Sequence, residues 1–402
     1  MHVLYITERT PWGAGEYFLY PEINALKAQG HEVTLVPVRV EKSQSPSGSQ
    51  EVDFWRGKSI CLPLLGRKTF RLAVKEFILH PFKVMTASLS VVLASGLTRN
   101  ALRNLQVIPK ALAVSSATRR MAPDHIHAYW ATQPATVAYI VHRLTGVPWS
   151  FTGHRWDLEA ETGLACKLTT AKFIRCISEH GAAAVRQRVG NSLQNKVHVI
   201  HVGTWVPTKP PRRRRTSKGG TYRIGLPANL IESKGHRYLM EAASLLRLAG
   251  IKVELDFYGD GPTGPALRHL ADSLGLGTVV RFHGRVPHEV MLEAYRELDV
   301  VMLPSLVEGI PVTLMEAMAA GVPVVATALE GVRELLDGGA GLMVPPKDPQ
   351  ALANTLQKLF TSPSLYEECV YKGWKRVAKE FSVQQTVQAL IHLWGGAPEH
   401  AG

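Results

Sequence analysis

The sequence predicts an α/β protein of two doubly wound domains, each built on a parallel sheet. The chain has 402 residues, which is more than a single domain of about 100–200 residues needs. Short apolar strands alternate with helical patterns in both halves of the chain. Between the halves, residues 206–220 are rich in Pro and charged residues and show no hydrophobic period, which is typical of a linker.

The first half opens with a βαβ unit. Residues 2–7 form an apolar strand, a Gly-containing loop follows, a helical stretch ends near Gly30, and residues 32–38 form the next strand. Strands joined through a helix pair in parallel. Further strands of this first domain, residues 1–205, are expected at 124–127, 149–152, 173–177 and 197–201.

The same pattern restarts after the linker and defines a second domain at residues 221–381. Its strands are expected at 222–226, 253–258, 279–283, 300–303 and 323–326. Residues 382–402 contain a terminal helix at 383–394, expected to pack back across the two domains. Two such halves face a cleft at the carboxyl ends of their strands, where we expect the ligand. The four linker arginines at 212–215 are either a solvated charge run or a phosphate or membrane contact.

Composition restricts the partners and the compartment. The formal net charge of +13 favours an anionic partner such as a nucleotide phosphate, a membrane surface or nucleic acid. Four cysteines without metal-type spacing indicate a reducing compartment. The N-terminus begins directly as a strand and not as a signal peptide, and the longest apolar run, 84–97, is shorter than the roughly 20 residues of a spanning helix. We therefore expect a cytoplasmic protein.

The most informative stretch is residues 308–327, which reads as a short helix running into a buried strand. Pro311 lies in the first turn and Gly321 follows the helix end. The N-terminus of such a helix favours anions. Glu308 precedes this helix and Glu316 lies on its second turn, so both carboxylates could accept hydrogen bonds from sugar or ribose hydroxyls, each contributing about 1.5–3 kcal/mol. Two surface glutamates are the alternative.

This stretch resembles the E-x7-E signature of retaining glycosyltransferases of family four, in the form E-G-x-P-x-x-x-x-E followed by A-x-A-x-G-x-P-V-V-A-T. Further landmarks occur in the family's order at residues 31–34, 150–154, 177–179, 234–235, 259–262 and 303–305. Residues 13–18, 22–23, 127–130 and 134–136 resemble the exopolysaccharide and colanic-acid-type members. The resemblance implies a GT-B fold, in which an N-terminal acceptor-binding and a C-terminal nucleotide-sugar-binding Rossmann-like domain face a cleft.

The resemblance also implies roles for individual residues in donor binding. Glu316 would hold the ribose hydroxyls, Glu308 the hydroxyls of the transferred sugar, and Lys234 the diphosphate, whose charge grows as it leaves. Asn229 stands where an arginine is usual, which leaves Arg237 as a nearby substitute. The remaining predicted donor contacts are Gly15, Arg285 through the backbone of its turn, and the helix start Gly309, Ile310, Pro311, Val312 and Thr313.

His154, in the loop after a strand, resembles the family histidine near the reacting sugar carbon; a buried structural histidine is the alternative. The predicted catalytic residues are thus His154, Lys234 and Glu308. No D-x-D triplet occurs, so we expect no metal and no cofactor besides the nucleotide diphosphate sugar donor. No covalent nucleophile is evident, and retention is expected from same-face attack within an ion pair.

A basic segment lies in the first domain. Residues 67–120 carry ten basic residues and one acidic residue, with Phe70, Val74, Phe77 and Ile78 at helical spacing. Such helices often lie on anionic membranes, which would make the protein peripheral at the inner face of the membrane. Packing against the sheet with a solvated basic face is the alternative. No nucleic-acid-binding module accompanies the charge, so no nucleic-acid partner is expected.

The predicted function is the metal-independent, retaining transfer of a hexose-type sugar from a nucleotide diphosphate sugar to a carbohydrate or lipid-linked acceptor, in polysaccharide or glycoconjugate biosynthesis. A sugar-nucleotide epimerase or hydrolase on the same fold is one alternative. A non-catalytic scaffold with a decayed site is another, for which Asn229 is the hint. The intact motif from Glu308 to Glu316 favours transfer over the scaffold.

Overall fold

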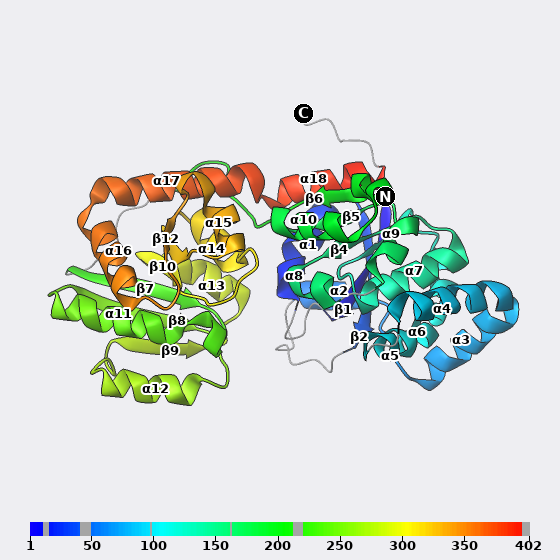
Figure 1. The fold of residues 1–402 in the computed structure, drawn as a ribbon, viewed down its shortest axis with the longest axis horizontal. Helices are drawn as coiled ribbons and strands as arrows, with labels where there is room; N and C mark the ends of the chain where they lie inside the picture. The colour runs from blue at the N-terminus through cyan, green and yellow to red at the C-terminus, as the bar shows by residue number, and fades with distance from the viewer. Residues whose placement is uncertain (11–15, 41–49, 97–98, 161–162, 212–219, 396–402) are drawn as a thin grey trace. The chain divides into compact units, whose positions relative to one another are not determined.

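A computed structural model of the chain describes residues 1–10, 16–40, 50–96, 99–160, 163–211 and 220–395 (Figure 1). The chain divides into two compact units. Unit 1 consists of Met1–His201 together with Thr386–Gly402, and unit 2 of Val202–Gln385. Each unit is a six-stranded sheet with helices packed around it, so the predicted α/β class with two doubly wound sheets is confirmed.

The sheet of unit 1 has the order β2-β1-β3-β4-β5-β6, and its neighbouring strands all pair in parallel. The strands are β1 (His2–Arg9), β2 (Glu32–Arg39), β3 (His125–Ala128), β4 (Trp149–Gly153), β5 (Ile174–Cys176) and β6 (Val197–Val199). The α-helices are α1 (Tyr20–Ala28), α2 (Gln50–Gly57), α3 (Arg67–Leu79), α4 (Pro81–Ser95), α5 (Arg99–Gln106), α6 (Ile108–Met121), α7 (Gln133–Thr145), α8 (Arg155–Ala160), α9 (Leu164–Thr170), α10 (Glu179–Arg188) and α18 (Val383–Trp394).

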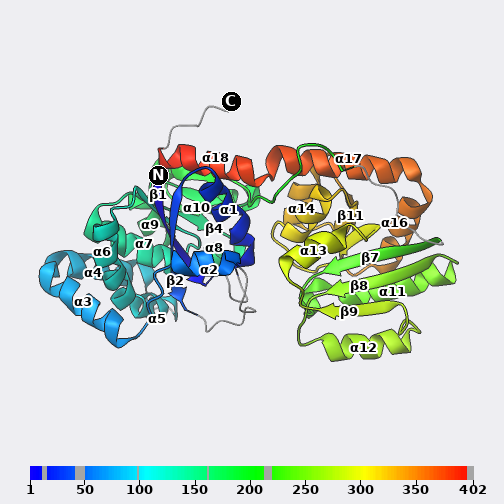
Figure 2. The same ribbon diagram turned by 180° about the vertical axis from the view of Figure 1, so that it is seen from behind.

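The sheet of unit 2 has the order β12-β11-β10-β7-β8-β9 and is also parallel. Its strands are β7 (Thr221–Pro227), β8 (Lys252–Tyr258), β9 (Val280–Gly284), β10 (Val300–Leu303), β11 (Val324–Thr327) and β12 (Leu342–Val344). The helices are α11 (His236–Leu248), α12 (Gly264–Ser273), α13 (His288–Tyr295), α14 (Val312–Ala319), α15 (Glu330–Leu336), α16 (Pro349–Thr361) and α17 (Pro363–Glu380), seen from behind in Figure 2.

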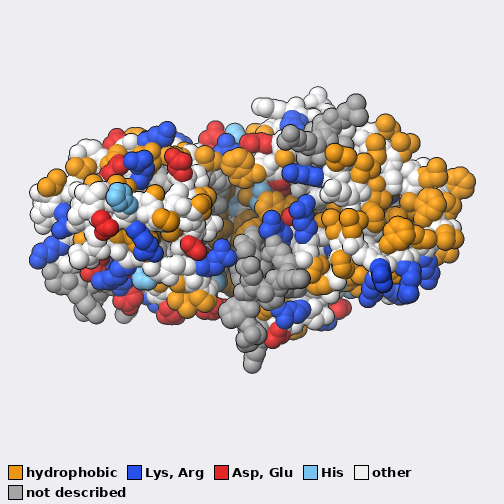
Figure 3. Space-filling view, turned by 90° about the horizontal axis from the view of Figure 1, so that it is seen from below, with side chains coloured by type: hydrophobic (Ala, Val, Ile, Leu, Met, Phe, Trp, Pro, Cys, Tyr) orange, Lys and Arg blue, Asp and Glu red, His pale blue; other side chains and the backbone are white. Residues whose placement is uncertain are grey.

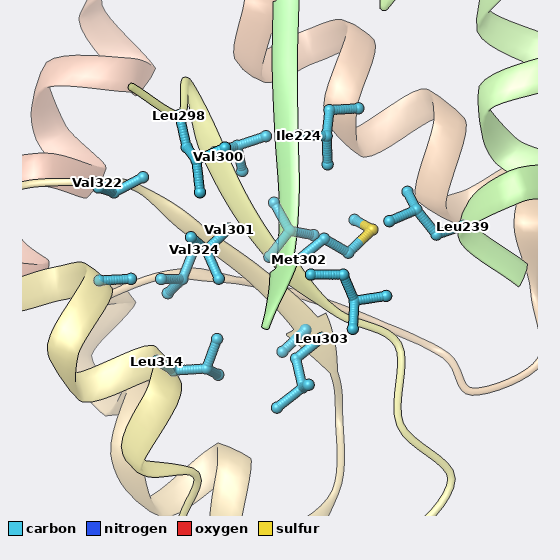
Figure 4. Close-up of a cluster of buried hydrophobic side chains, with 14 of the residues drawn as sticks. Ile224, Leu239, Leu298, Val300, Val301, Met302, Leu303, Leu314, Val322 and Val324 are labelled. Atoms are coloured by element: carbon cyan, nitrogen blue, oxygen red, sulfur yellow. The ribbon is translucent and has the colours of Figure 1, made fainter. Parts of the chain in front are cut away.

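The central strands of both sheets are buried along nearly their whole length, as expected where helices cover both faces of a parallel sheet. Every residue of β10 and β11 is buried, and so are five successive residues of β1. In unit 2, Leu239 of α11 and Leu314 of α14 join strand side chains such as Met302 in one hydrophobic cluster (Figure 4). The loops of each unit project from the ends of these buried strands.

Local signals in the sequence set several helix starts. The side chains of Ser178, Asp348 and Ser362 accept hydrogen bonds from backbone N–H groups in the first turns of α10, α16 and α17, which satisfies donors that the helix leaves free. Pro349 and Pro363 open α16 and α17, where a missing N–H costs nothing. Capping thus explains why these helices begin where they do.

The terminal helix α18 begins and ends at the residues that its periodicity predicts, 383 and 394. From Thr386 onward it belongs to unit 1, where the Thr386 hydroxyl donates to the carbonyl of His201 at 3.0 Å. The indole N–H of Trp394 donates to Ser150 Oγ at 3.3 Å, and its ring lies edge-on to Tyr5 of β1. The last strand, β12, was missed by the sequence analysis because only three residues separate Gly341 from Pro345.

The expectation of one basic surface over residues 67–120 is corrected at Lys110, which is fully buried in α6. Its ammonium donates to the carbonyls of Pro37, Val38 (2.8 Å) and Leu62 (2.7 Å), where β2 ends. Burial lowers the pKa of Lys110 to about 8. Lys110 therefore ties α6 to the end of β2 and contributes nothing to a basic surface.

Candidate active site

In unit 2 the candidate site lies where the strand order reverses. The chain passes from β7 to β8 and β9 on one side, then crosses to β10, β11 and β12 on the other, so the loops after β7 and β10 leave neighbouring strands in opposite directions. Ligands of open α/β sheets bind at such a switch point. The two loops contact each other directly, because Leu306 N donates to Ser233 O at 2.7 Å.

Glycines allow this close approach. Gly235 has φ 69°, and a Cβ atom there would lie 2.0 Å from the carbonyl oxygen of Pro304. Only glycine fits this position, for both its conformation and its space. After β8, a Cβ atom on Gly259 would lie 2.1 Å from the carbonyl oxygen of Ala228, and one on Gly261 would lie 2.3 Å from that of Leu230. The loops after β7, β8 and β10 therefore form one tightly packed group.

The predicted residues Lys234 and Glu308 meet in this group. Lys234 Nζ donates to Glu308 Oε1 at 2.6 Å, and the Ser305 hydroxyl donates to the same oxygen at 2.7 Å. The carboxylate is nearly buried, with 9% of its side chain exposed, whereas the lysine keeps 25% exposed. The ammonium is thus held by an anion at the switch point, on a side chain that remains partly exposed. Ser305 belongs to the family-like stretch 303–305 but was not predicted as a site residue.

Helix α14 begins directly after this ion pair. Pro311 is its N-cap residue and no side chain caps it, and Val312 and Thr313 form the first turn. The preceding turn is held tightly, since a Cβ on Gly331 would lie 2.2 Å from the carbonyl of Gly309. Ile310 is buried and fixes the turn from inside. Free N–H groups at this helix start, next to the Lys234 ammonium, make a binding place for an anion.

Glu316 lies one turn further along α14, in a different environment from Glu308. It accepts hydrogen bonds from His288 Nε2 at 2.7 Å and from the Tyr295 hydroxyl at 3.0 Å. Burial, and then the Glu316 charge, raise the pKa of Tyr295 well above its usual range, so the phenol remains a donor. A carboxylate has about four acceptor positions, so Glu316 keeps capacity for a ligand hydroxyl. The sequence analysis missed His288 and Tyr295.

The other predicted donor residues are scattered around these loops. Arg285 is exposed directly after β9, beyond Gly284, whose carbonyl accepts from Gly259 N at 2.8 Å. Asn229 is exposed in the loop after β7. The suggested substitute for the missing arginine, Arg237, instead pairs with Glu241 on its own helix at 3.4 Å. Gly15 lies outside the described residues.

Unit 1 has a corresponding switch point between β1 and β3, and His154 lies close to it, after β4. The His154 N–H donates to Asp157 Oδ1 at 2.6 Å, and Asp157 Oδ2 accepts from Ala131 N at 2.7 Å. The His154 ring lies against Trp130 with ring centroids 4.1 Å apart. Both ring nitrogens are buried without a hydrogen-bond partner among the described residues, and Nδ1 lies 3.7 Å from Asp157 Oδ2.

Glu16 completes this cluster and was not predicted as a site residue. Its carboxylate accepts from the Trp130 indole N–H and from the backbone of Glu8 (3.3 Å) and Arg9 (3.0 Å). It is only 2% exposed, and this burial raises its pKa to about 7. Glu16 thus fixes the indole that packs against His154. Its place in the family-like segment at 13–18 was the available signal, but its partner is 114 residues away.

Within the described ranges, no group of three or more His, Cys, Asp or Glu side chains is arranged to hold a metal ion. The switch point of unit 2 instead brings together an ammonium, two carboxylates and the start of a helix. This set can bind an anion and several hydroxyl groups. It matches the chemistry of a phosphate-bearing, hydroxyl-rich ligand.

Comparisons with known proteins agree with this description. Residues 221–362 match the family model described as Glycosyl transferases group 1. WcaL of Salmonella typhimurium, a glycosyltransferase named for colanic acid biosynthesis, is 34% identical over 174 residues, which cover 41% of this chain and 43% of that protein. The glycosyltransferase EpsD of Bacillus subtilis is 31% identical over 218 residues, covering 52% and 56%. The chain thus matches about half the length of these relatives.

Solved structures show the same fold at low identity. Anabaena HepE in complex with UDP superposes with a TM-score of 0.71 at 17% identity, covering 98% of this chain and 99% of that one. Sucrose-phosphate synthase from Thermosynechococcus elongatus gives 0.70 at 19% identity and covers 98% of both chains. The architecture is that of GT-B glycosyltransferases.

Proposed function

We propose, from the glycosyltransferase group 1 domain that residues 221–362 form, that this chain transfers a sugar from a nucleotide diphosphate donor to a carbohydrate or lipid-linked acceptor. The observation that carries the proposal is the Lys234–Glu308 pair beside the uncapped start of α14, at the switch point of unit 2. Polysaccharide or glycoconjugate biosynthesis is the proposed setting, in keeping with the names of WcaL and its relatives.

The donor diphosphate is proposed to bind at Lys234 and the α14 start. An ammonium and free backbone N–H groups are the donors that a diphosphate needs. The Lys234 side chain reaches solvent, so it can exchange Glu308 for a ligand phosphate without unfolding the loop. HepE has been solved with UDP and with UDP-glucose, which supports a nucleotide sugar of the hexose type for this chain as well.

The two glutamates are proposed to divide the rest of the donor between them. Glu316 accepts from the ribose hydroxyls, with His288 and Tyr295 orienting its carboxylate. Glu308 accepts from hydroxyls of the transferred sugar once phosphate has taken its place on Lys234. Arg285 contacts the base through its backbone. The different partners of the two glutamates support separate duties.

Transfer is proposed to retain the anomeric configuration and to need no metal. The bond from the anomeric carbon to the diphosphate oxygen breaks, and Lys234 and the helix start stabilise the charge on the departing group. The acceptor hydroxyl attacks the same face and forms the new glycosidic bond, while its proton passes to the departing phosphate. His154, whose ring Nε2 in unit 1 has no hydrogen-bond partner among the described residues, is proposed to hydrogen-bond the substrate. The proposed location is the cytoplasm, where the four cysteines stay reduced.

The test is acceptor-dependent turnover. A panel of nucleotide diphosphate sugars is first screened by thermal shift, because a ligand at 100 times its Kd stabilises the folded state by about 2.7 kcal/mol. The stabilising donor is then incubated with and without saccharide acceptors while nucleoside diphosphate release is followed. We expect release only with an acceptor. Release at the same rate without one would identify a hydrolase and overturn the proposal.

A further inference from the structure

Unit 1 exposes an unusual concentration of large apolar side chains on α3, α4 and α5 and just before α3. Of the 22 exposed large hydrophobic residues among those described, 13 lie between residues 65 and 105. They are Leu65, Phe70, Val74, Phe77, Ile78, Leu79, Phe82, Met85, Leu89, Val92, Leu93, Leu102 and Leu105. We refer to these 13 residues as the α3–α5 apolar surface. Single exposed hydrophobic residues are normal, but a contiguous group marks an interaction site.

Helix α4 contributes most to this surface because it carries two apolar stripes. On α4, Val84, Ala87 and Val91 are buried, and α4 packs on α7. The opposite side of the same helix carries Phe82, Met85, Leu89 and Leu93, at spacings of three and four residues, and is exposed. A helix that is apolar on all sides needs a nonpolar neighbour on all sides. The folded unit covers only the inner stripe.

Large apolar side chains are also exposed where α3 is followed by α4. The helix pair is bent by 112° at this point, across His80. Ile78, Leu79 and Phe82 flank this bend, with 70%, 57% and 81% exposure. Within the described part of the chain no single helix is long and apolar enough to span a bilayer; this bent pair passes that test only when the two are taken together.

Basic side chains accompany the apolar ones. Arg67, Lys68, Arg71, Lys75 and Lys83 are all exposed on α3 and α4. The sequence from 61 to 121 contains one acidic residue, Glu76, and this residue is buried and paired with Arg119. On the right of Figure 3, hydrophobic side chains gather beside a group of Lys and Arg. The surface is therefore apolar and positively charged, without an exposed carboxylate on these two helices.

We propose that the α3–α5 apolar surface seats unit 1 on an anionic lipid bilayer, with Phe82 and its neighbours at the acyl boundary and the lysines and arginines at the headgroups. Charge complementarity selects this occupant. A second copy of the chain would place two sets of like charges against each other, whereas anionic headgroups neutralise them. Amphipathic helices with basic residues beside an exposed apolar stripe bind in this way. Binding of this kind needs only the surface chemistry of unit 1 and does not depend on sugar transfer.

The first experiment measures binding of the full chain to vesicles by flotation. Unilamellar vesicles of phosphatidylglycerol and phosphatidylcholine in equal amounts are compared with vesicles of phosphatidylcholine alone. The wild type is expected to float with the anionic vesicles at low salt and to lose part of this binding at high salt, because screening weakens the charge contribution. Its failure to bind anionic vesicles at low salt would overturn the proposal.

Two triple variants separate the apolar and the charged contributions. Phe82→Ser with Leu89→Ser and Leu93→Ser should lower partitioning into both vesicle types by at least about a hundredfold. Lys68→Gln with Lys75→Gln and Lys83→Gln should lower only binding to anionic vesicles, also by about a hundredfold. The matched controls are Leu248→Ser for the apolar set, and Lys252→Gln, Lys358→Gln and Lys375→Gln for the charged set, all exposed positions of unit 2. Loss of vesicle binding in the controls as large as in the variants would overturn the assignment.

Insertion is tested directly by fluorescence. A Phe82→Trp variant should show a blue shift of its added emission when anionic vesicles are present, relative to wild type, whereas Leu248→Trp should show none. Sedimentation without vesicles tests whether a second copy of the chain covers this surface instead. In that case the substitutions at Phe82, Leu89 and Leu93 would dissociate a dimer and leave vesicle binding unchanged. That result would show that the surface pairs two copies and would refute lipid binding. Circular dichroism checks that each variant is folded.

Discussion

Replacing Lys234 by alanine tests the centre of the proposed donor site. In the structure its ammonium lies 2.6 Å from Glu308 Oε1, and the two side chains are 25% and 9% exposed. The substitution removes the positive charge from the switch point of unit 2 and leaves a nearly buried carboxylate with the Ser305 hydroxyl as its neighbour. The diphosphate would then meet a negative group where the wild type offers a positive one.

The expected loss can be worked out from this geometry. A charge-assisted hydrogen bond contributes about 1.5–3 kcal/mol, which corresponds to about 10- to 150-fold in rate. Repulsion between Glu308 and the departing phosphate adds to this loss, and both effects are largest in the transition state, where the charge on the leaving group is greatest. We expect kcat to fall by about 10²–10³-fold, and donor binding to weaken by about tenfold.

The assay measures kcat for nucleoside diphosphate release and, separately, the donor Kd by calorimetry. Lys234→Arg keeps the charge and should retain more activity than Lys234→Ala. Lys252→Ala, an exposed lysine at the start of β8, serves as the matched control and should leave both constants unchanged. A double substitution with Glu308→Gln shows whether the stranded carboxylate causes part of the loss, because that part should then be recovered.

Two results would refute this reasoning. Equal losses in donor binding and in kcat/KM would mean that Lys234 holds the ground state and not the leaving group. Excess chelator is expected to leave the wild type active. If chelator abolishes activity and magnesium or manganese restores it, a metal supplies the charge that we assign to Lys234 and the start of α14.

Three further predictions concern the glutamates and the loop glycine. Glu316→Ala should weaken binding of free nucleoside diphosphate by about tenfold or more, whereas Glu308→Ala should spare it and impair transfer; equal effects in calorimetry would contradict their separate duties. The raised pKa of Glu16, about 7, means that the folded state favours the protonated form. The unfolding free energy of the wild type minus that of Glu16→Gln should be highest below about pH 4.5 and should fall by about 3 kcal/mol as the pH rises to 7. Urea unfolding of both proteins at several pH values measures this difference. A difference that does not change with pH would contradict the prediction. Gly235→Ala should lower the free energy of unfolding by about 1–3 kcal/mol and reduce activity, because its Cβ would meet the Pro304 carbonyl 2.0 Å away; a variant with wild-type melting and turnover would show that the loop can give way.

Much of the fold could be predicted because the strands are buried on both faces. β10 is a run of four buried apolar residues, and its predicted bounds, 300 and 303, are those observed. The terminal helix α18 was equally clear, since its apolar residues recur at helical spacing. β12 was missed because three residues beside a glycine and a proline carry too little pattern. Such a short strand is defined by its neighbour β11 and not by its own sequence.

The candidate site was predictable as a set of residue types and not as a set of contacts. The family resemblance pointed to Lys234, Glu308 and Glu316, but not to the partners that hold them, His288 and Tyr295 among them. For Lys110 the residue type predicted the wrong environment: the sequence indicated a surface lysine, and the structure buries it. Its neighbours in the sequence are typical of a basic surface, yet its ammonium is satisfied by three carbonyls that come from other elements. A lysine's surroundings depend on the fold, which periodicity alone does not give.

The full strand orders of the two sheets differ, but in both the first strand lies where the order reverses, and both units place a side-chain pair between the loops at this point. In unit 1, β1 lies between β2 and β3, and in unit 2, β7 lies between β8 and β10. The loops after β1 and β3 are joined by Glu16 and Trp130, and those after β7 and β10 by Lys234 and Glu308.

The two pairs differ in a way that fits different tasks. Glu16 is 2% exposed and accepts three N–H donors, so it is fixed and suits the positioning of the ring against His154. Lys234 is 25% exposed and held by a carboxylate that an incoming anion can replace. A lysine that exchanges one anion for another must be accessible to solvent, whereas a carboxylate that holds a neighbouring side chain in place is best buried. We therefore propose that Lys234 contacts the donor directly and that Glu16 acts through Trp130.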